Sequence, residues 1–410
     1  MPISAIRWHR RSRMPTAVAL TAALGLALSG CGTAATGTGR DADPRANEGA
    51  GGGHGGAGGG HGGAVRTAVR RLAAQGDAPG AGVLIRRKGG GTRFIAAGVA
   101  DVRTGRRIHR SDHFRAGSLT KTVMAAVTLR LAAQKRLGLD DTVEKHLPGL
   151  VRGHGNDGRN ITIRQLLNHT SGLFDYTEDP ALARQLSAAA DRTRTPASLV
   201  RTALTHRPYF APGSKWRYSN TNYVLLGMVV QRATGHSYAA EARREELDPL
   251  RLHGTSFPGT RTTLPAPHGR AYTRDGGARD SEARSDGARR DVTDLNPSFA
   301  GAAGELVSTL DDLSRLLSGL LRGTVVPPAE LRQMRNTSAS DGQYGMGLFP
   351  VRLPCGVTLW GHNGEINGSY ALAVATPDGR HTLAYRLNST AGSGLTGETS
   401  LLEAEFCPRR

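Results

Sequence analysis

Long apolar runs are missing from this sequence of 410 residues, and both acidic residues and lysines are scarce. The composition is 38% hydrophobic and 21% charged, which excludes a multi-span membrane protein and also a wholly disordered chain. The histidines lack the spacing of metal ligands, so we expect neither a metal nor another cofactor. The length fits one large globular domain or two modest ones.

The charge of the chain is strongly positive but evenly spread. Of 53 basic residues only five are lysines, and against 34 acidic residues they give a formal net charge of +19. Nucleic-acid binding requires basic residues gathered on one face or helix, and no helix-turn-helix, zinc-finger or RNA-binding signature is present. We therefore expect no nucleic-acid partner. The charge indicates either compositional bias or affinity for anionic lipid headgroups or wall polymers.

Residues 1–30 have the order of an export signal. Four arginines precede an apolar run over 16–28 that is too short to span a bilayer. The run ends at Leu28-Ser29-Gly30-Cys31, which resembles the lipobox at which bacterial lipoproteins are cleaved and diacylated on the cysteine. We therefore predict a lipid anchor on Cys31 and a position at the outer face of the cell membrane. The alternative is an ordinary signal peptide, an incidental cysteine and secretion.

Residues 31–64 are expected to form a tether. They include the direct repeat GGGHGGA-GGGHGGA, which has no apolar residue larger than alanine and should stay flexible. His54 and His61 of this repeat are interpreted as linker residues, because two ligands on a flexible chain make a weak metal site. The folded domain is expected over 65–410, as a monomer.

Hydrophobic periodicity predicts an α+β fold. The pattern indicates strands at both ends of the chain and mostly helical structure over about 140–295, which would be inserted into the sheet domain. An antiparallel sheet flanked by helices, with strands from both termini, is the expected architecture. The predicted strands are 81–88, 92–99, 357–360, 371–376 and 382–386, with turns at Asn363-Gly364 and Asp378-Gly379. The predicted helices are 116–138, 161–168, 196–206, 222–234, 310–321 and 399–406, and residues 273–291 are expected to form a surface loop or a disordered excursion.

Two cysteines remain if Cys31 carries a lipid. Cys355 precedes a predicted strand and Cys407 follows the closing helix, so in an exported protein they are suited to one disulfide that ties this helix to the sheet. Two separate thiols are the alternative.

Ser118 and Lys121 are the first candidate catalytic pair. Their spacing places both side chains on one face at the start of a helix, where free N–H groups also favour developing negative charge. A lysine can act as a base when burial lowers its pKa, whereas an arginine cannot. The alternative is a surface lysine that follows a helix cap.

Two later motifs supply further polar groups. Tyr218 and Asn220 precede an apolar helix, where a phenol can relay protons and an amide can hold a substrate carbonyl. The alternative is a tyrosine packed under a loop. His362-Asn363-Gly364 is a weaker motif, although a glycine at a strand edge lets substrate backbone approach closely.

Together these motifs resemble the penicillin-recognising serine hydrolases, the superfamily of class C β-lactamases and D-alanyl-D-alanine carboxypeptidases. The resemblance covers most of residues 66–407 and is closest to exported DD-peptidases of actinomycetes, whose C-terminal cysteine pair also matches. It rests on FRAGSLTKTVMAAVTLRLAAQKRLGLDDTV, ITIRQLLNHTSGLFDYT, PGSKWRYSNTNYVLLGMVVQRATGHSY, YGMGLF and LWGHNGEINGSY.

This resemblance implies a role for each motif residue. Ser118 would be the acylated nucleophile, Lys121 its base and Tyr218 the proton shuttle, with Lys121 and Tyr218 sharing that work. Asn220 would hold the substrate amide. His362 would stand where other members carry lysine, and the backbone N–H groups of Ser118 and Glu365 would form the oxyanion hole. His169 would be a structural, hydrogen-bonded histidine at a helix start.

The sequence departs from the carboxypeptidases where these bind the free carboxylate of their substrate. Phe349 stands at the position of their arginine, and Asn363 and Glu365 replace two threonines. Glu365 would repel a carboxylate, and Arg352 would point to the other face of its strand. We therefore expect an acyl-serine hydrolase, D-alanyl-D-alanine carboxypeptidase-like on cell-wall peptides. The alternatives are an esterase, D-amino-acid amidase or β-lactamase, and a non-catalytic lipoprotein that binds wall peptide or β-lactam.

Overall fold

The computed structural model describes residues 59–75, 77–89, 91–188, 191–274, 289–390 and 396–408. The predicted signal peptide, the predicted lipidation site Cys31 and residues 32–58 of the predicted tether lie outside these ranges. None of the helices within them is both long enough and apolar enough to cross a lipid bilayer.

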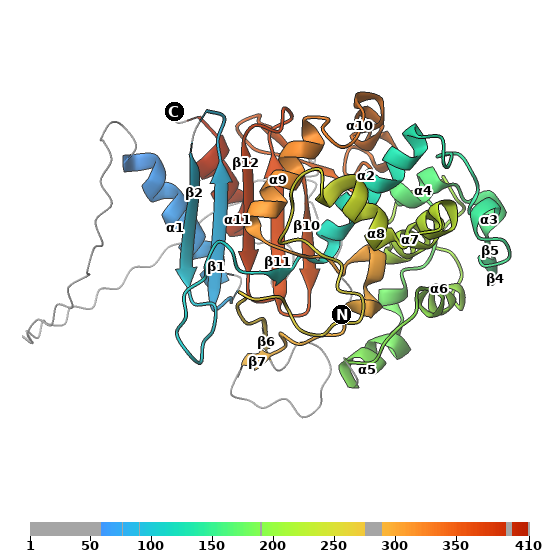
Figure 1. Cartoon of the computed structure of the whole chain (residues 1–410), viewed down its shortest axis with the longest axis horizontal. Helices are drawn as coiled ribbons and strands as arrows, with labels where there is room; N and C mark the ends of the chain where they lie inside the picture. The colour runs from blue at the N-terminus through green and yellow to red at the C-terminus, as the bar shows by residue number, and fades with distance from the viewer. Residues whose placement is uncertain are drawn as a thin grey trace, which may run out of the picture.

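A six-stranded antiparallel sheet with the order β2-β1-β12-β11-β10-β9 forms one side of the protein (Figure 1). The first strand is bonded directly to the last, with Ala81 opposite Leu387. The predicted α+β class, with a sheet built from both termini, is therefore confirmed. The strands are β1 (Gly80–Arg86), β2 (Thr92–Gly98), β9 (Phe349–Arg352), β10 (Thr358–Ile366), β11 (Ser369–Ala375) and β12 (Thr382–Leu387).

Helices cover both faces of this sheet. On one face α1 (Gly59–Gln75) and α11 (Thr396–Phe406) pack against each other and against an apolar cluster that includes Leu372. On the other face α9 (Leu310–Leu321) lies over β1, β11 and β12, and a larger cluster that includes Ala373 continues into the helical region. Thr309 caps the start of α9, because its side chain accepts a hydrogen bond from the backbone N–H of Asp312.

The helical region lies beyond the β10 side of the sheet, to the right in Figure 1. Its central helices are α2 and α7, which are largely buried and contact each other. The helices of the middle and late chain are α2 (Thr120–Ala133), α3 (Val143–His146), α4 (Ile163–Leu167), α5 (Pro180–Ala188), α6 (Pro196–Leu204), α7 (Asn220–Thr234), α8 (Tyr238–Ala242) and α10 (Pro328–Met334).

Three local predictions need correction. Helix α1 begins at Gly59, so residues 59–64 belong to a helix and not to the flexible tether; its apolar residues pack on the sheet. Asn363 and Gly364 lie within β10, because pairing with β11 continues to Ile366 and the turn follows there. The predicted loop over 273–291 is bordered by two short paired strands, Tyr272–Arg274 and Arg289–Asp291.

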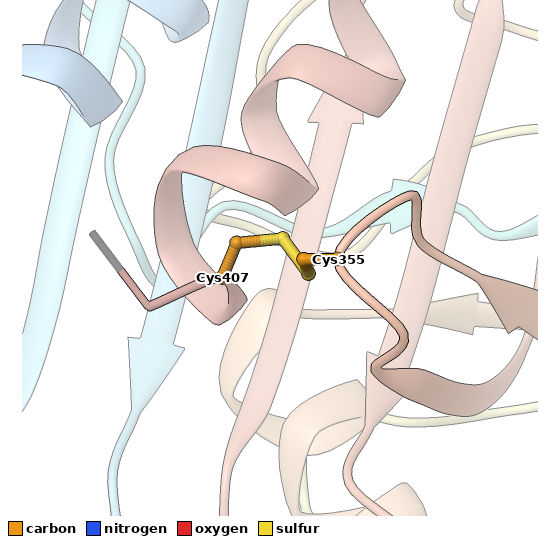
Figure 2. Close-up of a disulfide and its surroundings, with 2 residues drawn as sticks. All are labelled: Cys355 and Cys407. Carbon is orange, nitrogen blue, oxygen red and sulfur yellow. A yellow bond between two sulfur atoms is a disulfide. The ribbon is translucent and has the colours of Figure 1, made fainter. Parts of the chain in front are cut away.

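A disulfide joins Cys355 to Cys407, with their Cα atoms 5.9 Å apart. Figure 2 shows Cys407 at the end of a helix and Cys355 on the loop between two strands. The bond ties the C-terminus of α11 to the connection between β9 and β10.

Candidate active site

Ser118 and Lys121 meet where a short 3-10 turn (Gly117–Leu119) leads into α2. Ser118 is 5% exposed and Lys121 is fully buried. The turn is fixed by Thr120, whose hydroxyl donates to the carbonyl of Gly117 and accepts from the N–H of Leu306. The predicted pair is therefore brought together by the turn that precedes the helix.

The amine of Lys121 has three polar neighbours. Its Nζ atom lies 3.1 Å from Ser118 Oγ, 2.8 Å from Asn220 Oδ1 and 2.5 Å from the carbonyl oxygen of Ala303. Burial lowers the pKa of Lys121 to about 7, although the Asp175 carboxylate opposes the shift. A neutral amine has two hydrogens and one lone pair. Because Asn220 Oδ1 and the Ala303 carbonyl only accept, those hydrogens point to them and the lone pair faces the Ser118 hydroxyl.

Tyr218 lies close to both Ser118 and Lys121. Its ring is half-buried, and its centroid is 4.9 Å from Lys121 Nζ. Burial raises the pKa of the Tyr218 phenol well above its ordinary value, while a hydrogen bond with Ser118 opposes the rise. The phenol is therefore neutral near pH 7 and within reach of both Ser118 and Lys121.

Asn220 begins α7 and is fully engaged within the protein. Its side-chain oxygen accepts from Lys121, and its amide nitrogen donates to Asp175 Oδ2 at 2.9 Å. The Asn220 side chain thus links Lys121 to Asp175. Sequence reasoning missed Asp175, because 45 residues separate it from Asn220 and no local pattern connects them.

His362 is buried on β10 and carries no charge near pH 7. Burial lowers its pKa to about 3. Its Nδ1 lies 2.5 Å from the carbonyl oxygen of Asn363, so Nδ1 carries the hydrogen and Nε2 accepts from the Tyr344 hydroxyl at 3.0 Å. His362, which the resemblance places where other members carry a lysine, therefore does not supply the positive charge of that lysine.

Gly364 lets β10 lie against the nucleophile. A Cβ atom at Gly364 would lie 1.8 Å from the Ala116 carbonyl oxygen and 2.9 Å from the backbone nitrogen of Ser118. A Cβ at Gly117, which has a φ of +55°, would lie 2.6 Å from the backbone nitrogen of Glu365. Only glycine fits at either position, and the two backbone segments that carry the predicted oxyanion donors face each other.

Asn363 and Glu365 follow His362 on β10. Asn363 donates to the Tyr370 hydroxyl at 3.3 Å, and Tyr370 in turn donates to Glu398 of α11. The amide thus points to the face covered by α11. The side chain of Glu365 is half-buried, and burial raises its pKa to about 7.

An apolar contact lies at the position of the arginine with which the carboxypeptidases bind the free carboxylate of their substrate. Phe349 is 4% exposed, and its ring centroid lies 5.2 Å from that of His362. Arg352 is exposed and donates to the carbonyl oxygen of Gly342. The predicted divergence of Phe349 and Arg352 is therefore observed.

His169 supports the start of α7. Its Nδ1 accepts from the N–H of Ser219 at 3.2 Å and from the Asn222 side chain at 3.0 Å, and its ring stacks 4.3 Å from that of Tyr218. Burial lowers its pKa well below the ordinary value, so it remains neutral. Across the described residues, no group of three or more His, Cys, Asp or Glu side chains is arranged to hold a metal ion.

Comparison with known proteins agrees with this arrangement. The model of the family described as Beta-lactamase matches residues 65–405. A D-stereospecific amidohydrolase from Streptomyces sp. is 40% identical, with a TM-score of 0.76 over 85% of this chain and 99% of that one. A D-amino acid amidase from Ochrobactrum anthropi is 26% identical, with a TM-score of 0.71 over 84% of this chain and 98% of that one.

A curated relative matches a shorter part of the chain. Protein flp of Staphylococcus aureus is 33% identical over 187 residues, which make up 45% of this chain and 36% of that protein. This chain thus spans little more than a third of the length of that relative. With the family model covering nearly the whole described chain, the protein belongs to the Beta-lactamase family and is a serine hydrolase.

Proposed function

We propose that the protein hydrolyses an amide or ester bond of a D-amino-acid derivative through an acyl-enzyme on Ser118. The observation that carries the proposal is the set of contacts around Lys121 Nζ, which leaves a lone pair for the Ser118 hydroxyl. Similarity to a D-stereospecific amidohydrolase and a D-amino acid amidase supports the D-configured substrate.

The reaction runs in two stages. Ser118 Oγ attacks the substrate carbonyl carbon while its proton passes to Lys121 Nζ, and the N–H groups of Ser118 and Glu365 stabilise the oxyanion. When the intermediate collapses, the bond to the leaving group breaks and Tyr218 passes a proton from Lys121 to that group. Water then gives a proton back along the same path, attacks the ester carbonyl and releases the acid and free Ser118.

The charges of the side chains around β10 favour a substrate whose leaving-group end is uncharged. His362 is uncharged, Phe349 is apolar, and Glu365 becomes negative as pH rises above about 7. A free carboxylate at this position would meet no cation from these three residues and would be repelled by an ionised Glu365. An amide or ester avoids this repulsion.

A second candidate is a D-alanyl-D-alanine carboxypeptidase, favoured by the edge of β10. Strand β9 pairs with β10 only from Thr358 to Gly361. The next residues of that edge, from His362 onward, face the turn that carries Ser118, where an extended peptide can add to the sheet. Turnover of a D-Ala-D-Ala peptide in preference to its C-terminal amide would favour this candidate.

Intact-protein mass spectrometry tests the proposal. The wild type and Ser118→Ala would be incubated separately with a D-amino-acid amide, a simple ester, a D-Ala-D-Ala peptide and a penicillin. We expect an adduct on the wild type, followed by release of the hydrolysed product, and neither with Ser118→Ala. Ser214→Ala, which changes an exposed serine, is the matched control. Full turnover by Ser118→Ala would overturn the proposal.

We further propose that the chain is exported and anchored by a lipid on Cys31. The apolar run and the lipobox-like Leu28-Ser29-Gly30-Cys31 support this location. Expression of the full chain in a bacterium that processes lipoproteins should place it in the membrane fraction. Cys31→Ala should move it to the soluble exported fraction, and an unchanged membrane fraction for this variant would contradict the lipid anchor.

A further inference from the structure

Asp175 is a buried carboxylate that three hydrogen bonds, through Asn220 and Lys121, connect to the Ser118 nucleophile. It is 3% exposed, and four donors surround it. The N–H and hydroxyl of Thr177 donate to Oδ1 at 3.0 and 2.8 Å, and the N–H and side-chain amide of Asn220 donate to Oδ2 at 3.1 and 2.9 Å. Burial raises the pKa of Asp175, and the hydrogen bonds from Thr177 and Asn220 and the charge of Lys121 oppose this rise. Because all four partners donate, the ionised carboxylate satisfies them best.

This carboxylate decides which way the Asn220 amide faces. An amide has an oxygen that only accepts and a nitrogen that only donates. Asp175 can accept only from the nitrogen, so the oxygen is turned toward Lys121, 2.8 Å from Nζ. With the opposite orientation, the amide NH₂ would face the amine and compete for its lone pair.

We propose that Asp175 is a positioning residue for catalysis, which acts through Asn220 to direct the lone pair of Lys121 at the Ser118 hydroxyl. The inference rests on the proposed acyl-serine function and adds a residue that does not touch the reacting atoms. Its negative charge also favours the protonated form of Lys121, which must exist after the proton has left Ser118.

Other titratable groups near the amine are uncharged near pH 7. The Lys121 ammonium lies 4.9 and 5.6 Å from two tyrosine rings, and its charge lowers the pKa of two buried histidines. Burial keeps these two tyrosines and two histidines neutral, so Asp175 supplies the negative charge that acts on Lys121. These groups are Tyr218, Tyr223, His169 and His362.

The test is a double-mutant cycle with a pH profile. Asp175→Asn, Asn220→Ala and the double variant would be compared with the wild type for kcat/KM on a neutral D-amino-acid amide or ester. We expect each single variant to lose about tenfold to a hundredfold. The double variant should lose no more than Asn220→Ala alone, because both residues act on the same amine.

The pH profile separates positioning from a purely structural role. Removing the charge at Asp175 lowers the pKa of Lys121, so the acidic limb of kcat/KM should move to lower pH in Asp175→Asn. Asp312→Asn, which neutralises a buried carboxylate bonded to Gly254 and Thr255, should leave the limb in place. If Asp175→Asn does not fold by circular dichroism, Asp175→Glu takes its place in the cycle.

The outcomes distinguish the two proposals. Two results together would overturn the role of Asp175. The losses in kcat/KM of the two single variants would add up in the double variant, and the acidic limb of the pH profile would not move in Asp175→Asn. With Asp175→Glu in the cycle, added losses alone would overturn it. Full activity in Ser118→Ala would instead overturn the acyl-serine function on which it rests.

Discussion

Lys121 sets the acidity at which Ser118 can be activated, because the amine must be neutral to accept a proton. With a pKa of about 7, its neutral fraction grows as pH rises, so kcat/KM should increase through about pH 7 and level off above it. A guanidinium stays protonated at this pH, so Lys121→Arg should lower kcat/KM by about a thousandfold at pH 8. Lys135→Arg, at an exposed position, is the control. A flat profile between pH 5 and 9 would contradict the role of the amine.

Glu365 makes a separate prediction about substrate charge. Its pKa of about 7 means that it is neutral below and negative above that pH. The kcat/KM for a free-carboxylate peptide, divided by that for its neutral amide, should therefore fall about threefold to tenfold between pH 6 and 8. Titration of Lys121 affects both substrates and cancels in the ratio.

Glu365→Gln isolates the carboxylate at that position. The ratio should become independent of pH in this variant, whereas Glu330→Gln in α10 should behave as the wild type. The same decline in Glu365→Gln would show that another group discriminates against the carboxylate.

At the scale of elements, α11 is held by an ion pair at its C-terminal end. Glu405 accepts from Arg87 at 2.6 and 2.7 Å and lies 2.8 Å from His381 Nε2. Burial opposes ionisation of Glu405, but these hydrogen bonds outweigh it and lower its pKa to about 2. A lowered folded-state pKa stabilises the protein above the unfolded value near 4.5, and this contribution is lost as pH falls toward 2.

Glu405→Gln should therefore destabilise the protein by about 1–2 kcal/mol at pH 7, since Arg87 is partly exposed and solvent weakens the pair. Chemical unfolding at pH 7 and at pH 3 measures the difference, which should shrink at the lower pH. Glu403→Gln removes a carboxylate of the same helix without touching Arg87 and should have little effect. An equal loss at both pH values would argue against the charge as the cause.

Local sequence patterns predicted most of the helices and strands but not all of their first and last residues. The helix predicted over 310–321 has the same limits as α9. Helix α1 was missed because its glycine-rich start hid the helical spacing of Val65, Val69 and Leu72, which pack on the sheet. The turn predicted at Asn363-Gly364 failed because pairing with β11 overrides the local preference of this dipeptide.

The site was predictable only where its residues share a motif. Ser118 and Lys121 meet because three residues separate them, and the structure brings Tyr218 and Asn220 to them as the family resemblance implied. The groups that set the state of the amine also include the carbonyl of Ala303, which contacts it, and Asp175, which contacts Asn220; the fold supplies both from distant segments. Spacing along the chain contains no information about such contacts.

At the scale of the whole molecule, α1 closes one apolar face of the sheet. Val65, Val69 and Leu72 are fully buried there, and burying each such side chain is worth about 1.5–3 kcal/mol. A chain that begins at residue 59 should unfold at the same temperature as one that begins at residue 32. A chain that begins at residue 77 should lose at least about 4 kcal/mol, measured by calorimetry or denaturant titration. Equal stability of all three chains would mean that α1 does not contribute to the core.

The pairing of β1 with β12 has a consequence for the time at which activity can arise. While the chain is being synthesised, Ser118 and Lys121 are present long before β10, β11 and β12 exist. During that interval β1 is paired with β2 but lacks β12, and the strand that carries Gly364 and Glu365 cannot close over the serine. The nucleophile therefore stays inert on an unfinished chain, and the hydrolase becomes active only once its last strand has joined its first.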